Sequence, residues 1–337
     1  MAGSVDVAAT EGKNWVDRVD PELKEVARQL PDMTISSRWK AALMNTLMCL
    51  PSPTPQGVKA MKVKGIGTLF LPSDETNAAP TTSASAILWM HSGGRIVGSA
   101  NAVTEKILCS IIVNRFGLPV LSVEYRLAPS HPFPAALDDA HKAYTWLVSH
   151  LDSTTVTGKM KSEVKIAVAG ESAGAGLAAE LCQRLLDESQ DQEVPVPVCQ
   201  LLFYPMLDDR TCTDTALSKL PLHLVWNNKS NMYGWSSYLG PKHKPGDESL
   251  PKYASASRRE DLTNLPPAII QVGDLDLFWN ECKDYAKRLE AVGVETVFVE
   301  IKGMFHGAMT IGGMRDVRPV VEAWERFEAF GKKFLFD

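Results

Sequence analysis

Residues 168–176 have the sequence VAGESAGAG, and this stretch decides the fold. Only Glu171 and Ser172 interrupt its run of tiny or apolar residues. The apolar residues 164–170 predict a strand that leads into it, and the residues after it carry leucines at helical spacing. A Gly-x-Ser-x-Gly sequence between a strand and a helix is typical of a nucleophile elbow, a sharp turn that exposes the serine above a sheet. We therefore predict that Ser172 is a nucleophile.

Small neighbours are a steric requirement of such a turn. Gly170 and Gly174 lie two positions before and after Ser172, where a side chain would collide with the turning backbone. The same turn aims the backbone N–H of Ala173, at the start of the helix, towards an oxyanion that develops at the serine. An ordinary glycine-rich turn that contains a serine is the alternative, so the interpretation depends on catalytic partners.

A serine hydroxyl needs a base to act as a nucleophile. In enzymes built around a nucleophile elbow, the catalytic acid and then the histidine follow the serine along the chain. His306 lies in GMFHGA after the last predicted strand, and it is the candidate base among seven histidines. A surface or core role is the alternative for any single histidine. The acid is expected after the apolar segment 268–273, where GDLDLFWNE offers Asp274 and Asp276. Either carboxylate would orient the histidine, and spacing alone does not choose between them.

The stretch HSGGR at 91–95 follows another predicted strand, 86–91. Gly93 and Gly94 can bring backbone N–H groups close to a carbonyl oxygen, which predicts further donors of an oxyanion hole. A plain tight turn is the alternative interpretation.

Apolar strands alternate with helices along most of the chain, which predicts an α/β fold with a mostly parallel sheet covered on both faces. The alternation breaks at residues 206–265, which are rich in tryptophan, tyrosine, asparagine and proline and are interpreted as an inserted cap. The predicted strands are 57–72 (as a pair), 86–91, 119–127, 164–170, 199–205, 268–273 and 295–301, and the predicted helices include 101–116, 134–150, 279–291 and 318–335. The predicted organisation is an N-terminal helical cap segment (1–55), the first part of the core (56–205), the cap insert (206–265) and the second part of the core (266–337).

The composition argues against several other classes of protein. The net charge is −5 and no long basic run occurs, so nucleic-acid binding has no electrostatic support. The six cysteines form no CxxC pair and suit no zinc site, so we expect them to be small buried hydrophobic residues. The N-terminus lacks a signal-peptide pattern and no segment is long and apolar enough to span a membrane, so a cytoplasmic protein is predicted.

With these motifs in order, the sequence resembles the hormone-sensitive-lipase-like family of α/β-hydrolase esterases. The family's HGGG motif is HSGG here (91–94), and its GDSAGG motif is GESAGA. The most specific match is VEYRLAPSHPFPAALDDAHKAYTWL (123–147), and FYPMLDDR (203–210) and FHGA also match. The resemblance covers the chain from about residue 60 to the C-terminus and implies an α/β-hydrolase fold with a helical cap.

The resemblance also implies roles for individual residues. In the family, a Tyr-Ala-x-x-Leu sequence follows the acid motif, and aligning it on Tyr285, Ala286 and Leu289 places the acid on Asp276 rather than Asp274. The implied triad is Ser172, Asp276 and His306, and the implied oxyanion donors are the N–H groups of Gly93, Gly94 and Ala173.

Several positions depart from the family pattern, and three of them lie in the two glycine-rich motifs or directly after one. Ser92 replaces the first glycine of HGGG, and a serine with positive φ there would be strained. Arg95 stands where the family usually has an aromatic or aliphatic residue. A cation beside the pocket would favour an anionic or carbonyl-rich substrate, and an arginine paired with an acid on the rim is the alternative. Glu171 replaces an aspartate and is expected to keep a supporting contact to the loop.

The resemblance implies that the N-terminal helices and the insert form a cap over the serine. Aromatic residues of the insert are predicted to line an apolar pocket, although any one of them is more often an ordinary core residue. A cap of this size favours short acyl chains or compact esters. Family members often dimerise through the edge of the last strand. A homodimer is therefore one possible oligomeric state, and the sequence does not decide it. The predicted substrate-binding residues are Arg95, Trp226, Tyr233 and Trp235.

The leading hypothesis is a serine carboxylester hydrolase that acts on a small-molecule ester and needs no metal or organic cofactor. The second is action on a specialised natural-product ester, lactone or amide, or acyl transfer to an alcohol. The third is a non-catalytic small-molecule receptor on the same fold, and the presence of His306 argues against it.

Overall fold

The computed structural model of this chain describes residues 15–48, 50, 52–73, 84–154, 164–189, 194–215, 217, 224–310 and 316–336. Within these residues, eight strands form one sheet in the order β1-β2-β4-β3-β5-β6-β7-β8. Strand β2 pairs antiparallel with β1 and β4, and the other neighbours are parallel. The strands are β1 (Val58–Val63), β2 (Gly67–Pro72), β3 (Ala84–Met90), β4 (Val120–Val123), β5 (Val164–Glu171), β6 (Cys199–Phe203), β7 (Ala268–Gly273) and β8 (Thr296–Ile301).

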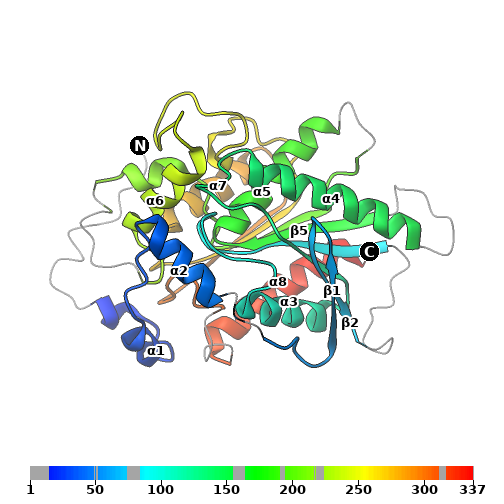
Figure 1. The fold of residues 1–337 in the computed structure, drawn as a ribbon, viewed down its shortest axis with the longest axis horizontal. Helices are drawn as coiled ribbons and strands as arrows, with labels where there is room; N and C mark the ends of the chain where they lie inside the picture. The colour runs from blue at the N-terminus through cyan, green and yellow to red at the C-terminus, as the bar shows by residue number, and fades with distance from the viewer. Residues whose placement is uncertain are drawn as a thin grey trace.

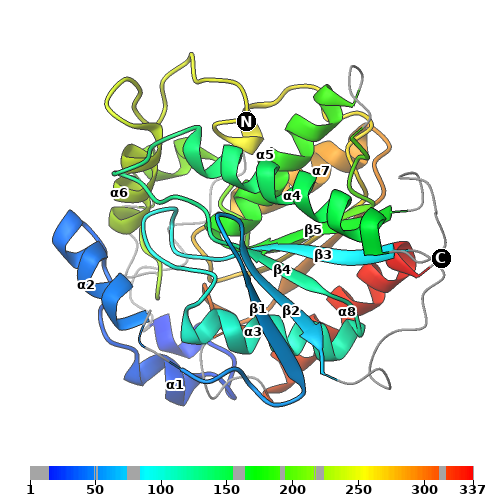
Figure 2. The same ribbon diagram turned by 45° about the vertical axis from the view of Figure 1, so that its right-hand side comes forward.

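Helices cover both faces of this sheet (Figure 1). The central strands are buried along nearly their whole length, so each face needs an apolar cover. Helices α3 (Val103–Phe116) and α8 (Arg318–Leu335) lie on one face, and α4 (Ala135–Thr154), α5 (Ala173–Glu188) and α7 (Trp279–Ala291) lie on the other (Figure 2).

The order of strands and helices is the one predicted from the sequence, and α7 and α8 begin and end at the predicted residues. Strand β4 is shorter than the predicted strand 119–127. Beyond it the chain leaves the sheet, and the Ala128 N–H donates to the carbonyl of Arg95 at 2.9 Å. A contact with a neighbouring loop therefore replaces strand pairing in a segment whose local sequence favours a strand.

Two segments far apart in the sequence meet at one end of the sheet. The N–H of Ile35, in the N-terminal segment, donates to Ser230 Oγ in the insert at 2.9 Å. Helices α1, α2 and α6 lie at the same end of the molecule in both views (Figures 1 and 2). Residues 1–14 of the predicted N-terminal cap segment lie outside the described residues. The N-terminal elements are η2 (Trp15–Arg18), α1 (Lys24–Gln29) and α2 (Arg38–Met48), and those of the insert are η5 (Asp209–Thr213), α6 (Asn228–Leu239) and η7 (Ala256–Arg258).

Three whole-chain expectations concern membranes, cysteines and metals. None of the described helices combines the length and the apolar character needed to cross a membrane. The five described cysteines are free and buried, as predicted, and Cys49 lies outside the described residues. In the same part of the chain, no group of three or more His, Cys, Asp or Glu side chains could hold a metal ion.

Candidate active site

Ser172 connects β5 to α5 in a strained turn. Its φ and ψ are 54° and −122°, a region that non-glycine residues rarely occupy. Hydrogen bonds hold the backbone there: the Ser172 N–H donates to the carbonyl of Phe203 at 2.9 Å, and its own carbonyl accepts from Gly176 and Met206 at 3.0 Å. The surrounding backbone therefore enforces the conformation that the motif predicts.

The two glycines of the motif are required by the close approach of backbone atoms. A Cβ on Gly170 would lie 2.6 Å from the carbonyl carbon of Gly174. A Cβ on Gly174 would lie 2.2 Å from the carbonyl oxygen of Met90, at the end of β3. Larger residues would push the strand and the helix apart, which is the physical reason for the Gly-x-Ser-x-Gly pattern.

Ser172, His306 and Asp276 form a hydrogen-bonded row. His306 Nε2 lies 2.9 Å from Ser172 Oγ, and His306 Nδ1 lies 2.8 Å from Asp276 Oδ2. The three residues are only 2–4% exposed. Because a carboxylate only accepts hydrogen bonds, Nδ1 carries the proton, and Nε2 presents its lone pair to the serine hydroxyl. This geometry suits a nucleophile, its base and an orienting acid.

The turn after β7 separates the two candidate aspartates. Asp276 accepts from the N–H of Phe278 at 2.9 Å through Oδ1 and contacts His306 through Oδ2. Asp274 contacts a different loop, where it accepts from the N–H of Gly303 at 2.7 Å. The contacts therefore match the alignment that selected Asp276, and Asp274 joins two loops at their base.

The loop after β3 carries Gly93 to the wall of the cavity beside the serine, and Gly94 follows it. Their φ angles are 114° and 60°, which glycine adopts without strain. A Cβ on Gly93 would lie 2.1 Å from the carbonyl oxygen of Val97, and a Cβ on Gly94 would lie 2.1 Å from Trp226 Cη2. The third predicted donor, Ala173, is the first residue of α5.

The backbone conformation of this loop shows how it accommodates a serine in place of the family's glycine. Ser92 is not among the described residues with positive φ, so the serine that replaces the family's glycine is not strained in this way. Arg95 instead has a φ of 62°. The loop therefore accommodates Ser92 without positive φ, and the non-glycine residue with positive φ lies three positions later.

His91 holds the start of the same loop. Its ring is buried, stacks on Tyr125 with ring centres 4.0 Å apart, and has Nδ1 2.8 Å from the carbonyl oxygen of Ser92. A carbonyl only accepts, so Nδ1 carries the proton. Burial lowers the pKa of His91 to about 4, so the ring is neutral near pH 7.

Glu171 supports the serine turn from behind. Its Oε2 accepts from the Tyr204 hydroxyl at 2.6 Å, and its carboxylate lies against that of Glu105. Burial and the neighbouring Glu171 raise the pKa of Glu105 well above its ordinary value, which favours the protonated carboxylic acid beside Glu171. The backbone of Ser92 opposes this rise in the pKa of Glu105.

A cavity of about 120 Å³ lies beside Ser172 and His306. Its wall is mostly apolar, and much of it comes from the N-terminal segment. Motif analysis missed these residues because no motif marks them, and the only signal was the expectation that the N-terminal helices belong to a cap. The N-terminal lining residues are Met33, Ile35, Met44 and Met48.

The described lining includes Trp226, as predicted, but not the other three predicted substrate-binding residues. Arg95 is fully buried, with Nη2 2.6 Å from Glu180 Oε1, and Trp235 is buried with its ring centre 4.8 Å from Arg95 Cζ. Tyr233 packs against the hydrophobic core. The structure therefore does not bring these three side chains to the described wall. The Arg95 cation instead lies where a carboxylate and aromatic rings stabilise it, which an apolar cavity does not offer.

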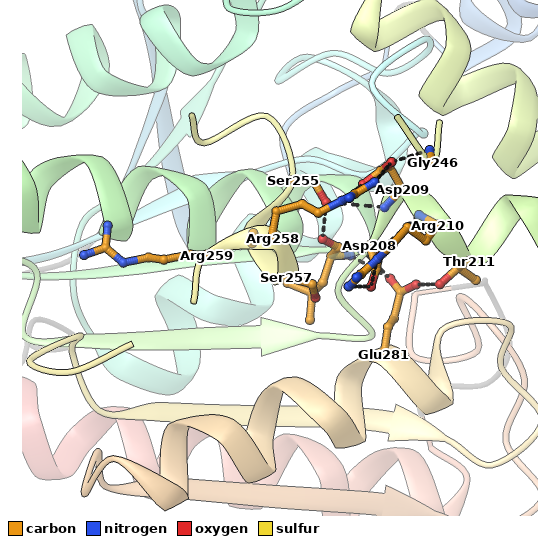
Figure 3. A network of polar contacts seen from close by, with 12 residues as sticks. Asp208, Asp209, Arg210, Thr211, Gly246, Ser255, Ser257, Arg258, Arg259 and Glu281 are labelled. Atoms are coloured by element: carbon orange, nitrogen blue, oxygen red, sulfur yellow. Dashed lines mark hydrogen bonds and ion pairs between the residues drawn. The ribbon is translucent and has the colours of Figure 1, made fainter. Parts of the chain in front are cut away.

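A polar network holds the chain that follows β6 (Figure 3). Glu281, on α7, accepts from the N–H of Leu207 at 2.6 Å. Asp209 binds two nitrogens of Arg258, each at 2.8 Å. Met206, which donates to the serine carbonyl, immediately precedes these residues. The network thus fixes the segment that closes the serine turn, and this segment includes the FYPMLDDR motif.

A family model described as an alpha/beta hydrolase fold matches residues 87–310. The chain belongs to this family. Similar proteins include the carboxylic ester hydrolase LipN of Mycobacterium tuberculosis, 30% identical over 67% of this chain and 57% of that protein. An ethyl acetate hydrolase of Pseudomonas putida is 28% identical over 70% of this chain and 69% of that protein. Among solved structures, a bacterial heroin esterase matches with a TM-score of 0.79 and 25% identity over 96% of this chain and 100% of that chain.

These comparisons confirm the predicted fold and the resemblance to hormone-sensitive-lipase-like esterases. The relatives and the structural neighbour are named as ester hydrolases. The chain spans little more than half of the length of LipN, so the activity of the whole relative is not transferred to it directly.

Proposed function

We propose that this protein is a serine carboxylester hydrolase that acts on small esters through an acyl-enzyme. The observation that supports it most is the row of Ser172, His306 and Asp276, with contacts of 2.9 and 2.8 Å. The ester-hydrolase names of the relatives agree with it. The proposed oxyanion donors are the N–H groups of Gly93, Gly94 and Ala173.

In the proposed mechanism, Ser172 Oγ attacks the ester carbonyl carbon while His306 Nε2 accepts its proton. Asp276 holds the imidazole in the required tautomer and stabilises the cation that forms. The three backbone N–H groups stabilise the negative charge on the former carbonyl oxygen. The bond to the alcohol then breaks as His306 protonates the leaving oxygen. Water, deprotonated by His306, attacks the acyl-enzyme in the same way and releases the acid.

The size and polarity of the cavity support a preference for short or compact esters. A cavity of about 150 Å³ accommodates a molecule the size of benzene, and the space beside Ser172 is about 120 Å³. The apolar methionines in its wall favour a hydrocarbon acyl group over a charged one. A relative named for ethyl acetate, itself a short ester, is consistent with this choice.

We also propose that the N-terminal segment (1–55) and the insert (206–265) form a cap over the core segments 56–205 and 266–337. Three observations support this division: the hydrogen bond from Ile35 to Ser230, the N-terminal residues in the cavity wall, and the position of α1, α2 and α6 at one end of the sheet. The cap would then set the size of the acyl group that reaches the serine.

The test is hydrolysis of p-nitrophenyl acetate, butyrate, octanoate and palmitate by the wild type and Ser172→Ala. We expect fast turnover of acetate and butyrate, much slower turnover of palmitate, and a loss of at least about 10⁴-fold in kcat in the variant. Turnover that survives in Ser172→Ala would contradict the proposed nucleophile. Equal turnover of all four esters would contradict the proposed size limit.

The remaining hypotheses have no specific observation in their favour. Arg95 prompted the idea of an anionic or carbonyl-rich substrate, and it does not line the described cavity. A receptor without catalysis does not need the hydrogen bond between His306 and Ser172. Acyl transfer is measured in the same assay by adding an alcohol and quantifying the new ester.

A further inference from the structure

A second set of buried charges lies beside the oxyanion loop and takes no part in the mechanism above. Arg95 directly follows Gly94, is 0% exposed, and donates from Nη2 to Glu180 Oε1 at 2.6 Å. Glu180 is equally buried and also accepts from the Tyr238 hydroxyl at 3.1 Å. Burying two charges costs free energy that an apolar pair would avoid. We therefore expect the Arg95–Glu180 pair to have a function other than packing.

Arg95 also stacks on the cap helix α6. Its Cζ lies 4.0 Å from the ring centre of Tyr238 and 4.8 Å from that of Trp235, and both rings belong to α6. Nε and Nη1 of Arg95 have no hydrogen-bond partner among the described residues. A planar guanidinium gains from contact with aromatic faces. One side chain thus connects the loop to α5 through an ion pair and to α6 through ring contacts.

The backbone around Arg95 is held as firmly as the side chain. Its φ of 62° is a conformation that a non-glycine residue keeps only when its surroundings impose it. Its carbonyl accepts from the Ala128 N–H at 2.9 Å. The carbonyl oxygen of Gly94 lies 3.1 Å from the position that a Cβ on Gly234 of α6 would take. The loop is therefore packed directly against the backbone of the cap helix.

The position of Glu180 links the donors of the proposed oxyanion hole to one another. Glu180 lies on α5, and the first residue of α5 is Ala173. The ion pair with Arg95 therefore joins the Gly93–Gly94 loop to the helix that carries the third donor. A rigid connection of this kind fixes the distances among the three N–H groups, on which oxyanion stabilisation depends.

We propose that Arg95 is a positioning residue that fixes the oxyanion loop to α5 and to the cap helix α6. The inference rests on the proposed function, because it concerns the donors of the proposed oxyanion hole. Arg95 touches no reacting atom and acts through the backbone of Gly93 and Gly94. A displaced loop weakens interactions made in the transition state and leaves the apolar cavity intact. Loss of Arg95 therefore lowers kcat with little change in KM.

The test compares the wild type with Arg95→Met and with the double variant Arg95→Met/Glu180→Gln on p-nitrophenyl acetate. Burial raises the pKa of Glu180 to about 7, and removal of its cation makes the charged form still less favourable, so the double variant replaces it with a neutral amide. We expect the double variant to melt close to the wild type, with kcat lower by roughly 10- to 100-fold and KM within about 3-fold. A wild-type kcat in a double variant that melts normally would overturn the proposal.

A matched control lies on the far side of the sheet. Arg115 pairs with Glu328 at 2.9 Å and lies over the ring of Trp324 at 5.7 Å, so it makes the same two kinds of contact between α3 and α8. Arg115→Met should leave kcat unchanged. If the double variant fails to fold, Arg95→Lys replaces it, since lysine keeps the charge but loses the planar stacking, and the same fall in kcat is expected.

A second readout separates this proposal from the proposed function. A fluorophosphonate phosphonylates the serine and places its phosphoryl oxygen in the oxyanion hole, so we expect its labelling rate to fall with kcat. Absence of ester hydrolysis by the wild type would contradict the proposed function. Equal labelling rates in the wild type and the double variant would overturn the role of Arg95.

Discussion

Ser172 lies between two loops that are held in place by different means. On one side, Asp276 and His306 follow β7 and β8 and contact each other at 2.8 Å, and His306 contacts the serine at 2.9 Å. On the other side, Gly93 and Gly94 follow β3, the Gly94 carbonyl packs against Gly234 of α6, and Arg95 connects the loop to α5 and α6. The proposed acid–base side depends on the sheet, and the proposed oxyanion side depends also on its contacts with α6.

This difference suggests that the two halves of the site respond to different changes. Strand ends are set by the ladder of the whole sheet, so the acid–base geometry changes only if the core changes. The proposed cap is built from the N-terminal segment and the insert, which are far apart in the sequence and contribute no strand to the sheet within their described residues. A protein of this design can therefore alter transition-state stabilisation through its cap while its proposed triad stays intact.

The largest expected effect comes from replacing, one at a time, the two aspartates in the turn after β7. Asp276→Asn should lower kcat by roughly 10⁴-fold, because the amide favours the wrong tautomer of His306. Asp274→Asn should lower it by less than about 10-fold, because the amide oxygen can still accept from the Gly303 N–H. Steady-state kinetics of both variants on p-nitrophenyl acetate checks the contrast, and similar losses in the two would contradict it.

On the oxyanion side, Gly94→Ala tests whether the loop tolerates any displacement. The new Cβ would lie 2.1 Å from Trp226 Cη2, so the loop or the buried Trp226 ring must shift. We expect kcat to fall by roughly 10²–10³-fold, the loss typical of one missing oxyanion donor.

Gly293→Ala is the control for backbone strain in that experiment. Gly293 has a φ of 82°, comparable to that of Gly94, but nothing lies within 4 Å of the position of its Cβ. This variant should lose some stability and keep its kcat. A fall in kcat equal to that of Gly94→Ala would show that general strain, and not displacement of the loop, is the cause.

The smallest expected effect is a pH dependence of stability at His91. Its pKa lies at about 4 in the folded protein, against 6.5 ordinarily, so in this window the unfolded chain binds a proton that the folded chain does not. The free energy of unfolding should therefore fall as the pH is lowered from 6.5 towards 4, by up to about 3 kcal/mol from this group.

Urea unfolding at several pH values, with His91→Gln beside the wild type, isolates this contribution. The glutamine amide can still donate to the Ser92 carbonyl but does not titrate. The variant should show a slope that is shallower by up to about 1.4 kcal/mol per pH unit. Identical slopes would mean that the neutral state of His91 does not contribute to holding the oxyanion loop.

The sequence alone determined those features that depend on neighbouring residues or on chain order. The strand–turn–helix around Ser172 follows from local patterning and from glycines that the close approach of backbone demands. The order of strands and helices and the position of His306 after the last strand follow from the alternation of apolar segments and from the family pattern. Even the choice of Asp276 over Asp274 needed the resemblance, because both follow the same strand and only the course of the turn separates them.

The tertiary structure decided where side chains far apart in the sequence meet. No local pattern shows that Arg95 finds Glu180 and two rings of α6, or that Met44 and Met48 of α2 form a wall beside Ser172. A buried charge is stable only where a group of opposite charge or an aromatic ring contacts it. A cavity is bounded by whichever apolar surface packs over it. Both outcomes depend on how the cap and core pack together, which is a property of the folded chain rather than of any one segment.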